Sequence, residues 1–275
     1  MKGGEALGKL GRFLHLWRES MAELQALIFD VDGTLADTER DGHRVAFNKA
    51  FADAGLDWDW SVELYGQLLE VTGGKERIRF YLDHFNTGFE RPDDLDSFIA
   101  DLHKKKTAHY TNMLAEGAIP MRSGVKRLLQ EAREAGLRLA IATTTTPANV
   151  GALLQHSLDA DAEGWFEVIA AGDIVPAKKP APDIYSWAMQ QMDISPDVCV
   201  AFEDSENGVK SAVGAGINTV LVTTNDYTED HDFNGAELVL DQLGEPGDGF
   251  RVISGDAGGA DHVDLALLRR FHAGA

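Results

Sequence analysis

Short apolar runs with strand character recur along the chain, and the segments between them carry helical patterns. The runs fall at residues 26–31, 137–143, 166–172, 198–203 and 219–223, with a shorter one at 237–240 that we expect at a sheet edge. Helical patterns occupy residues 123–136, 180–192 and 205–216. Continuous apolar runs are typical of strands that are buried on both faces. Their alternation with helices predicts an α/β fold whose core is a doubly wound parallel sheet.

One long segment interrupts this alternation. Residues 39–115 contain helical patterns but no convincing strand, so we expect a helical cap inserted after the first strand. The remaining parts are an N-terminal extension at residues 1–22 and an α/β core made of residues 23–38 and 116–275. Within the cap, consecutive Lys104, Lys105 and Lys106 are typical of a solvated helix face. The sequence thus predicts two packed units, one of them helical.

The charge balance restricts the partners of this chain. Its 275 residues include 45 acidic and 25 basic side chains, which give a formal net charge of −20. This charge argues against nucleic acid or an anionic membrane, and we expect a monomer with a small-molecule ligand. The single cysteine, Cys199, excludes an intrachain disulfide and fits a reducing compartment. We therefore expect a cytoplasmic protein, or one of the plastid stroma if residues 1–22 are a transit-peptide remnant.

Polar residues gather where the predicted parallel strands end. They are Asp30 and Asp32 after the first run, Thr143 after the second, Lys178 and Lys179 before the helix at 180–192, and Glu203 and Asp204 after the fourth. Ligands of such sheets bind beyond the carboxyl ends of the strands. Four carboxylates in one place repel one another unless a cation lies among them, and Mg²⁺ prefers oxygen ligands. A lysine beside that ion would hold a phosphoryl group.

The pair Asp30 and Asp32 suits nucleophilic chemistry. Side chains two residues apart on an extended segment point the same way. One carboxylate can therefore attack while the other handles protons, and an aspartyl-phosphate would divide one difficult displacement into two easier steps. Gly33 and Thr34 allow the chain to turn away and expose both groups.

Together these residues resemble the four motifs of the haloacid dehalogenase (HAD) superfamily, and the insert resembles its type 1 cap. The motifs are DVDGT at 30–34, Thr143 after an apolar strand, Lys179 in KPAPD, and Glu203-Asp204 in EDSENG. The resemblance implies that Asp30 is the nucleophile and Asp32 the general acid and base. It implies that Thr143 and Lys179 hold the transferring phosphoryl group; the KPAPD register favours Lys179, and Lys178 stays open as the alternative. It implies that Asp30, Asp32, Glu203 and Asp204 bind Mg²⁺.

The motifs also separate the chemistries of the superfamily. A dehalogenase needs neither an acid at the position of Asp32 nor a metal, so the resemblance implies phosphoryl transfer. Transfer to water makes a phosphatase, and transfer back to a sugar makes a β-phosphoglucomutase-like mutase, which stays open as the alternative. A scaffold that only binds a partner is a further alternative, but it predicts the loss of at least one catalytic group, and all are present.

Substrate choice is expected to lie in the cap. Gly73 and Gly74 form a tight loop that opens a helix, on which Lys75 and Arg79 share a face at i, i+4 spacing. A helix N-terminus with two cations suits a second anionic group, although a solvated basic helix is the alternative. Residues 37–48, 68–82 and 142–150 resemble the CbbY-type subgroup, whose studied members dephosphorylate xylulose-1,5-bisphosphate, an inhibitor of Rubisco. The predicted sugar-phosphate contacts are Glu39, His43, Gly74, Lys75, Arg79, Arg122 and Thr144.

Overall fold

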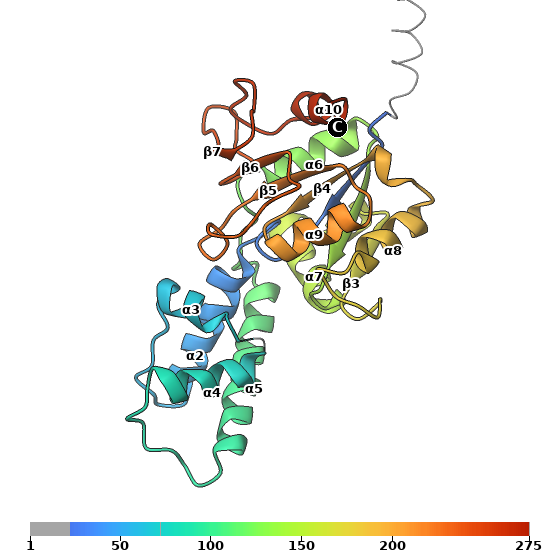
Figure 1. The fold of residues 1–275 in the computed structure, drawn as a ribbon. Helices are drawn as coiled ribbons and strands as arrows, with labels where there is room; N and C mark the ends of the chain where they lie inside the picture. The colour runs from blue at the N-terminus through green and yellow to red at the C-terminus, as the bar shows by residue number, and fades with distance from the viewer. Residues whose placement is uncertain (1–22, 72, 275) are drawn as a thin grey trace, which may run out of the picture.

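The computed structural model describes residues 23–71 and 73–274, so the predicted extension at residues 1–22 lies outside the described part. A seven-stranded sheet forms the core, in the order β3-β2-β1-β4-β5-β6-β7 (Figure 1). The strands are β1 (Ala26–Phe29), β2 (Arg138–Thr143), β3 (Val168–Ala171), β4 (Cys199–Glu203), β5 (Thr219–Thr223), β6 (Leu238–Leu240) and β7 (Val252–Ser254). The first six pair in parallel, which confirms the predicted α/β fold with a parallel sheet.

The edge of the sheet differs from the prediction. Residues 237–240 were expected at the edge, but β7 pairs antiparallel with β6 and takes that place. The side chains of β7 are exposed, and the strand has three residues, so it lacks the buried apolar run that marks the other strands. This exposure explains why apolar runs alone missed it.

The sheet is buried on both faces, because alternate residues of each strand enter different cores. In β1, Leu27 and Phe29 belong to one cluster of buried side chains, and Ala26 and Ile28 to the other. The first cluster includes side chains of α6 (Val125–Glu134), α7 (Pro147–Leu153) and α10 (Leu265–His272). The second includes side chains of α8 (Asp183–Met192) and α9 (Glu206–Gly214). Helices on both faces leave the carboxyl ends of the strands as the open edge.

A group of helices separates β1 from β2, and we call it the cap (Figure 1). It comprises a π-helical stretch η1 (Thr38–Arg44) and the helices α2 (Val45–Asp53), α3 (Val62–Leu68), α4 (Gly74–His84) and α5 (Leu95–Ala115). The cap has its own core of mainly aromatic residues, including Phe47, Phe51 and Trp60. Of the lysine run, Lys104 and Lys105 are exposed, but Lys106 is buried, so the expectation of a solvated face was wrong for Lys106.

Short helical turns complete the described chain: η2 (Leu154–Leu158), η3 (Ala162–Trp165) and η4 (Pro196–Val198). The cap joins the core through two adjacent linkers, because the Arg122 amide donates to the Leu35 carbonyl and Ala36 bridges to Met121. Within residues 23–71 and 73–274, no helix is long and apolar enough to cross a membrane.

Because the cap has its own aromatic core, removing one of its buried rings should destabilise the protein. Replacing fully buried Phe51 with alanine should lower the free energy of unfolding by about 3–5 kcal/mol, because it removes packing and leaves a cavity. The matched change of Phe85, which is 42% exposed, should cost well under half of that. Urea denaturation followed by circular dichroism measures both, and equal losses would contradict this description of the cap core.

Candidate active site

Asp30 follows β1 directly and lies at the centre of the open edge. Its amide donates to the Phe202 carbonyl at 3.0 Å, which continues the pairing of β1 with β4 up to the functional side chain. Gly33 then turns the chain with a φ of 83°, a conformation that other residues rarely adopt. A side chain at Gly33 would also collide with the Asp204 carboxylate and the Asn225 amide. Glycine is therefore needed at this turn for both its backbone angle and its size.

Lys179 joins the end of β1 to the end of the neighbouring strand β4. Its Nζ lies 2.6 Å from Asp30 Oδ1 and 2.6 Å from Glu203 Oε1, with only 8% of the side chain exposed. Burial alone would lower the pKa of Lys179, but the two carboxylates raise it, so the ammonium stays charged. Lys178, the alternative, pairs instead with Asp173 at the surface.

Glu203 has a second partner and one free oxygen. The Tyr185 hydroxyl donates to Glu203 Oε1 at 2.6 Å, and Tyr185 is fully buried in α8. Glu203 Oε2 is buried and has no hydrogen-bond partner among the described residues. Burial, which the charge of Lys179 only partly offsets, raises the pKa of Glu203 to about 7. A buried carboxylate oxygen without a partner is costly unless a cation binds it.

Asp30, Glu203 and Asp204 together fit a divalent cation. One oxygen from each lies within 4.8 Å of the others, and all three residues are buried. Burial and the charges of Asp30 and Glu203 raise the pKa of Asp204 well above its usual range. Three carboxyl groups face one ammonium group here, so ionisation of all three would leave negative charge uncompensated, which the raised pKa values of Glu203 and Asp204 reflect. Hard oxygen ligands and this charge suit Mg²⁺, and the free oxygen of Glu203 is consistent with such a site.

Asp32 lies in a different environment from Asp30. Its Oδ1 accepts a hydrogen bond of 2.5 Å from the Thr38 hydroxyl. Burial and the charge of Asp30 raise the pKa of Asp32 to about 6. A carboxyl group with this pKa holds a proton in part of the molecules near neutral pH, as a group that both donates and accepts protons requires.

The threonine run divides between the site and the surface. Thr143 is buried at the end of β2, where its hydroxyl accepts from the Thr145 amide at 3.3 Å. Thr145 in turn hydrogen-bonds Asp32, which lowers the pKa of that carboxyl. Thr144 is exposed. The structure thus brings Thr143 and Thr145 to the site and leaves Thr144 outside these contacts.

In the cap, Glu39 belongs to a hydrogen-bonded group. The Tyr65 hydroxyl donates to Glu39 Oε2 at 2.6 Å and accepts from Arg77 Nη1 at 2.7 Å. Arg77 is buried and also donates to the carbonyls of Leu68 and Val71. The cation of α4 that faces Glu39 is therefore Arg77, which the sequence interpretation did not name.

His43 lies beside a second buried cation. Its Nδ1 is 2.8 Å from Lys106 Nζ, and its ring stacks on Tyr110 with centroids 3.8 Å apart. Burial lowers the pKa of His43 to about 4 and that of Lys106 to about 8. At neutral pH the lysine is charged and the histidine neutral, so Lys106 donates to Nδ1 and leaves the proton of His43 on Nε2.

Within the described ranges, the remaining predicted contacts, Gly74, Lys75, Arg79 and Arg122, form no hydrogen bond or ion pair with the Glu39 and His43 groups. Lys75 and Arg79 are exposed, and Arg79 pairs with Asp96 of α5. Gly74 opens α4 with its α-carbon close to the His103 ring. Arg122 is 9% exposed and donates to the carbonyls of Gly33, Thr223, Thr224 and Asp241 while facing Asp37. Its guanidinium therefore fastens the loop after β1 to the ends of β5 and β6, with its donors taken up by the protein.

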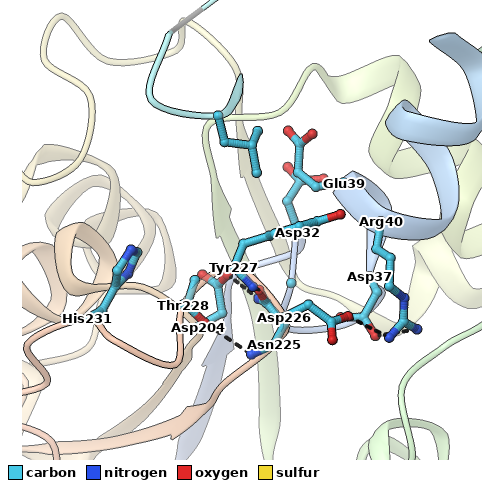
Figure 2. Close-up of a pocket in the computed structure, with 12 residues that line it drawn as sticks. Asp32, Asp37, Glu39, Arg40, Asp204, Asn225, Asp226, Tyr227, Thr228 and His231 are labelled. Atoms are coloured by element: carbon cyan, nitrogen blue, oxygen red, sulfur yellow. Dashed lines mark hydrogen bonds and ion pairs between the residues drawn. The ribbon is translucent and has the colours of Figure 1, made fainter. Parts of the chain in front are cut away.

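A cavity of about 220 Å³ lies between the loop after β1 and the cap (Figure 2). Asp32, Asp204 and Asn225 line its core side, and Glu39 and Leu69 line its cap side. Figure 2 shows the Asn225 amide linked to Asp204, which it contacts at 2.8 Å. The cavity leaves room for a small ligand between the buried carboxylates of Asp30, Glu203 and Asp204, which we call the acidic group, and the cap.

Binding of a divalent cation should be measurable without a substrate. Relief of carboxylate repulsion should raise the melting temperature when Mg²⁺ is added, with about 2.7 kcal/mol of stabilisation at a hundredfold excess over Kd. Asp204→Asn should raise the melting temperature of the metal-free protein, because it removes one repelling charge, and should abolish the Mg²⁺ effect. Asp173→Asn, a surface control, should keep it. An unchanged Mg²⁺ effect in Asp204→Asn would place the ion elsewhere.

Comparison with known proteins agrees with this geometry. The family model of haloacid dehalogenase-like hydrolases matches residues 24–216. The protein CbbY of Cupriavidus necator is 47% identical over 253 residues, covering 91% of this chain and 98% of the relative. The protein CbbY of Rhodobacter capsulatus is 51% identical over 221 residues, covering 80% of this chain and 94% of the relative.

A solved structure is similar over most of its length. It is a mutant CbbY from Rhodobacter sphaeroides in complex with xylulose-1,5-bisphosphate, 46% identical, with a TM-score of 0.65. The match covers 80% of this chain and 94% of the solved chain. The buried acidic group, the lysine that bridges it and these similarities lead to one conclusion. The chain belongs to the haloacid dehalogenase-like hydrolases, in the CbbY-type group, and is a phosphoric monoester hydrolase.

Proposed function

We propose that this protein is a Mg²⁺-dependent phosphatase of a small sugar bisphosphate, and that xylulose-1,5-bisphosphate is its substrate. The observation that carries the proposal is Lys179, which pairs with both Asp30 and Glu203, while Asp32, two residues after Asp30, has its pKa raised to about 6 by burial and the charge of Asp30. The bisphosphate is supported by its presence in the complex of the CbbY relative. Removal of this Rubisco inhibitor would then be the role of the protein.

Asp30 would act as nucleophile on the phosphorus atom. Its carboxylate attacks, the ester bond to the sugar oxygen breaks, and an aspartyl-phosphate forms on Asp30. Asp32 donates its proton to the leaving sugar oxygen, which its raised pKa of about 6 permits. Asp32 then accepts a proton from the water that attacks the phosphorus atom, the bond between phosphorus and the Asp30 oxygen breaks, and inorganic phosphate leaves with the Asp30 carboxylate regenerated. Lys179 and Thr143 would stabilise the charge on the transferring phosphoryl oxygens.

Asp30, Glu203 and Asp204 would hold the metal, with Asp32 contributing its backbone carbonyl. Mg²⁺ would supply charge neutralisation for the phosphoryl oxygens when bound. Tyr185 fixes the Glu203 carboxylate by donating to Oε1, and Oε2 lies against Gly208 without a hydrogen-bond partner among the described residues. Asn225 fixes the Asp204 carboxylate by donating from its side-chain amide to Oδ2.

The cap would recognise the second phosphate and the sugar hydroxyls. Lys106 and Arg77 are buried cations on the cap side of the site, and Glu39 and neutral His43 offer hydrogen-bonding groups beside them. Gly74 and Lys75 lie at the N-terminus of α4, which favours anions. The net charge of −20 repels such a substrate at long range, so these local cations must dominate at short range.

The proposal extends to domain organisation, oligomeric state and location. We assign residues 39–115 as a cap domain on a core of residues 23–38 and 116–275, and expect a monomer. A cytoplasmic location is supported by the bacterial relatives, and the plastid stroma stays the alternative if residues 1–22 are a transit-peptide remnant.

The proposed function is tested by phosphate release with Mg²⁺ across a panel of sugar phosphates. The panel includes xylulose-1,5-bisphosphate and β-glucose 1-phosphate, and Asp30→Asn serves as the blank. We expect the highest kcat/KM for xylulose-1,5-bisphosphate and none above background in the blank. Isomerised glucose phosphate with little free phosphate would identify a mutase instead, and turnover of no substrate would favour a binding scaffold.

The lowered pKa of Lys106 predicts that kcat/KM depends on pH. If it binds substrate, kcat/KM for the bisphosphate should fall as the pH rises through about 8, where Lys106 loses its charge. The folded chain should meanwhile gain stability between about pH 8 and 10.5, because the unfolded state binds the proton more tightly there. Lys106→Arg should remove the inflection, since arginine stays charged, whereas Lys104→Arg at the surface should keep it. An inflection that persists in Lys106→Arg would assign it to another group.

A further inference from the structure

The turn at residues 225–228, which follows β5, lines the cavity together with Asp204 and the cap residue Glu39 (Figure 2). Asn225 organises this turn. Its Nδ2 donates to Asp204 Oδ2 at 2.8 Å, and its Oδ1 accepts from the Tyr227 amide at 3.0 Å. Thr228 closes the turn, because its hydroxyl accepts from the Asn225 amide and its own amide donates to the Asn225 carbonyl. One side chain therefore fixes both Asp204 and the backbone that carries Tyr227.

Tyr227 crosses from this turn to helix α3 of the cap. Its ring lies 5.9 Å from the Tyr65 ring at an interplanar angle of 60°. It also covers Gly66, where an added methyl group would come within 3.2 Å of the Tyr227 ring. Tyr65 is the residue whose hydroxyl holds Glu39. The contact thus connects a core turn to Glu39, which lines the cavity on its cap side.

Asp226 makes a second connection to the cap. Its Oδ2 lies 2.8 Å from Arg40 Nη1, in the π-helical stretch that begins the cap. Arg40 is further fixed by Asp41 at 2.8 Å and Asp37 at 3.3 Å. Two consecutive core residues therefore hold two different parts of the cap, one by charge and one by packing.

We propose that Asp226 and Tyr227 are positioning residues that seat the cap on the core, and that Asn225 ties this seating to Asp204. The inference deepens the proposed function and rests on it for the choice of substrate. A substrate that reaches the cap depends on how the cap is seated, whereas a substrate confined to the core does not. Fixing Asp204 by a bound cation should also steady the turn and, through Tyr227, helix α3.

The kinetic test compares a long and a short substrate with Mg²⁺ present. Tyr227→Ala should lower kcat/KM for xylulose-1,5-bisphosphate by about tenfold to a hundredfold, because misplaced cap groups lose their contacts. Acetyl phosphate, whose two carbons do not extend to the cap, should be hydrolysed as by the wild type. Equal losses on both substrates would overturn the proposal, since they would show damage to the core site.

Two further variants separate seating from folding. Gly66→Ala should favour helix formation in α3, yet its methyl group would press on Tyr227, so we expect the same selective loss. Asp226→Asn should act in the same direction. The matched control is Asp230→Asn, because Asp230 lies in the same loop and pairs with no residue in the described ranges. A Gly66→Ala variant with wild-type kinetics would contradict the Tyr227 contact.

Amide hydrogen exchange tests the seating without turnover. With Mg²⁺ as the only ligand, exchange in residues 62–68 should be slower than in the metal-free wild type. Tyr227→Ala should speed exchange in residues 62–68 and remove the Mg²⁺ effect there, while β1 and β4 stay protected. Unchanged protection of α3 would overturn the proposal. If the wild type hydrolyses neither substrate, the proposed function fails, and the exchange data still decide whether the turn seats the cap.

Discussion

The site depends on the ion pair that Lys179 makes with two strands. Its ammonium lies between Asp30 at the end of β1 and Glu203 at the end of β4, and all three side chains are buried. Such charges are stable in a protein interior only when they are paired and hydrogen-bonded. Asp204 adds a third carboxylate that Lys179 does not neutralise, which is why a divalent cation fits. Lys179 thus compensates part of the negative charge of the three carboxylates, and a cation is needed to compensate the rest.

Other residues hold this group in place from outside. Arg122 fastens the loop after Asp30 to β5 and β6, and Tyr185 and Asn225 hold Glu203 and Asp204. These contacts come from three separate segments of the core. A site built this way is preorganised, so little rearrangement is needed when charge develops on a phosphoryl group.

The sheet, and the position of the motif residues at the carboxyl ends of its strands, could be predicted from the sequence. Buried strands and the polar residues that follow them have simple patterns. The cap residues could not be predicted in the same way. Arg77 and Arg79 lie on one helix two residues apart, and only the packing of α4 decides that Arg77 is buried. Likewise the rotation of α5 buries Lys106 and exposes its neighbours. The contact of Tyr185 with Glu203 could not be predicted either, because the sequence around Tyr185 indicates only a helix and Glu203 lies in a different element.

Trapping the phosphoryl adduct shows whether Asp30 is the nucleophile. The enzyme is quenched during a single turnover of xylulose-1,5-bisphosphate and treated with borohydride, which reduces an acyl phosphate to an alcohol. Peptide mass spectrometry then locates the reduced residue. We expect homoserine at position 30 in the wild type and none in Asp30→Asn. Reduction at Asp32 or Glu203, or no reduced residue despite turnover, would contradict the mechanism.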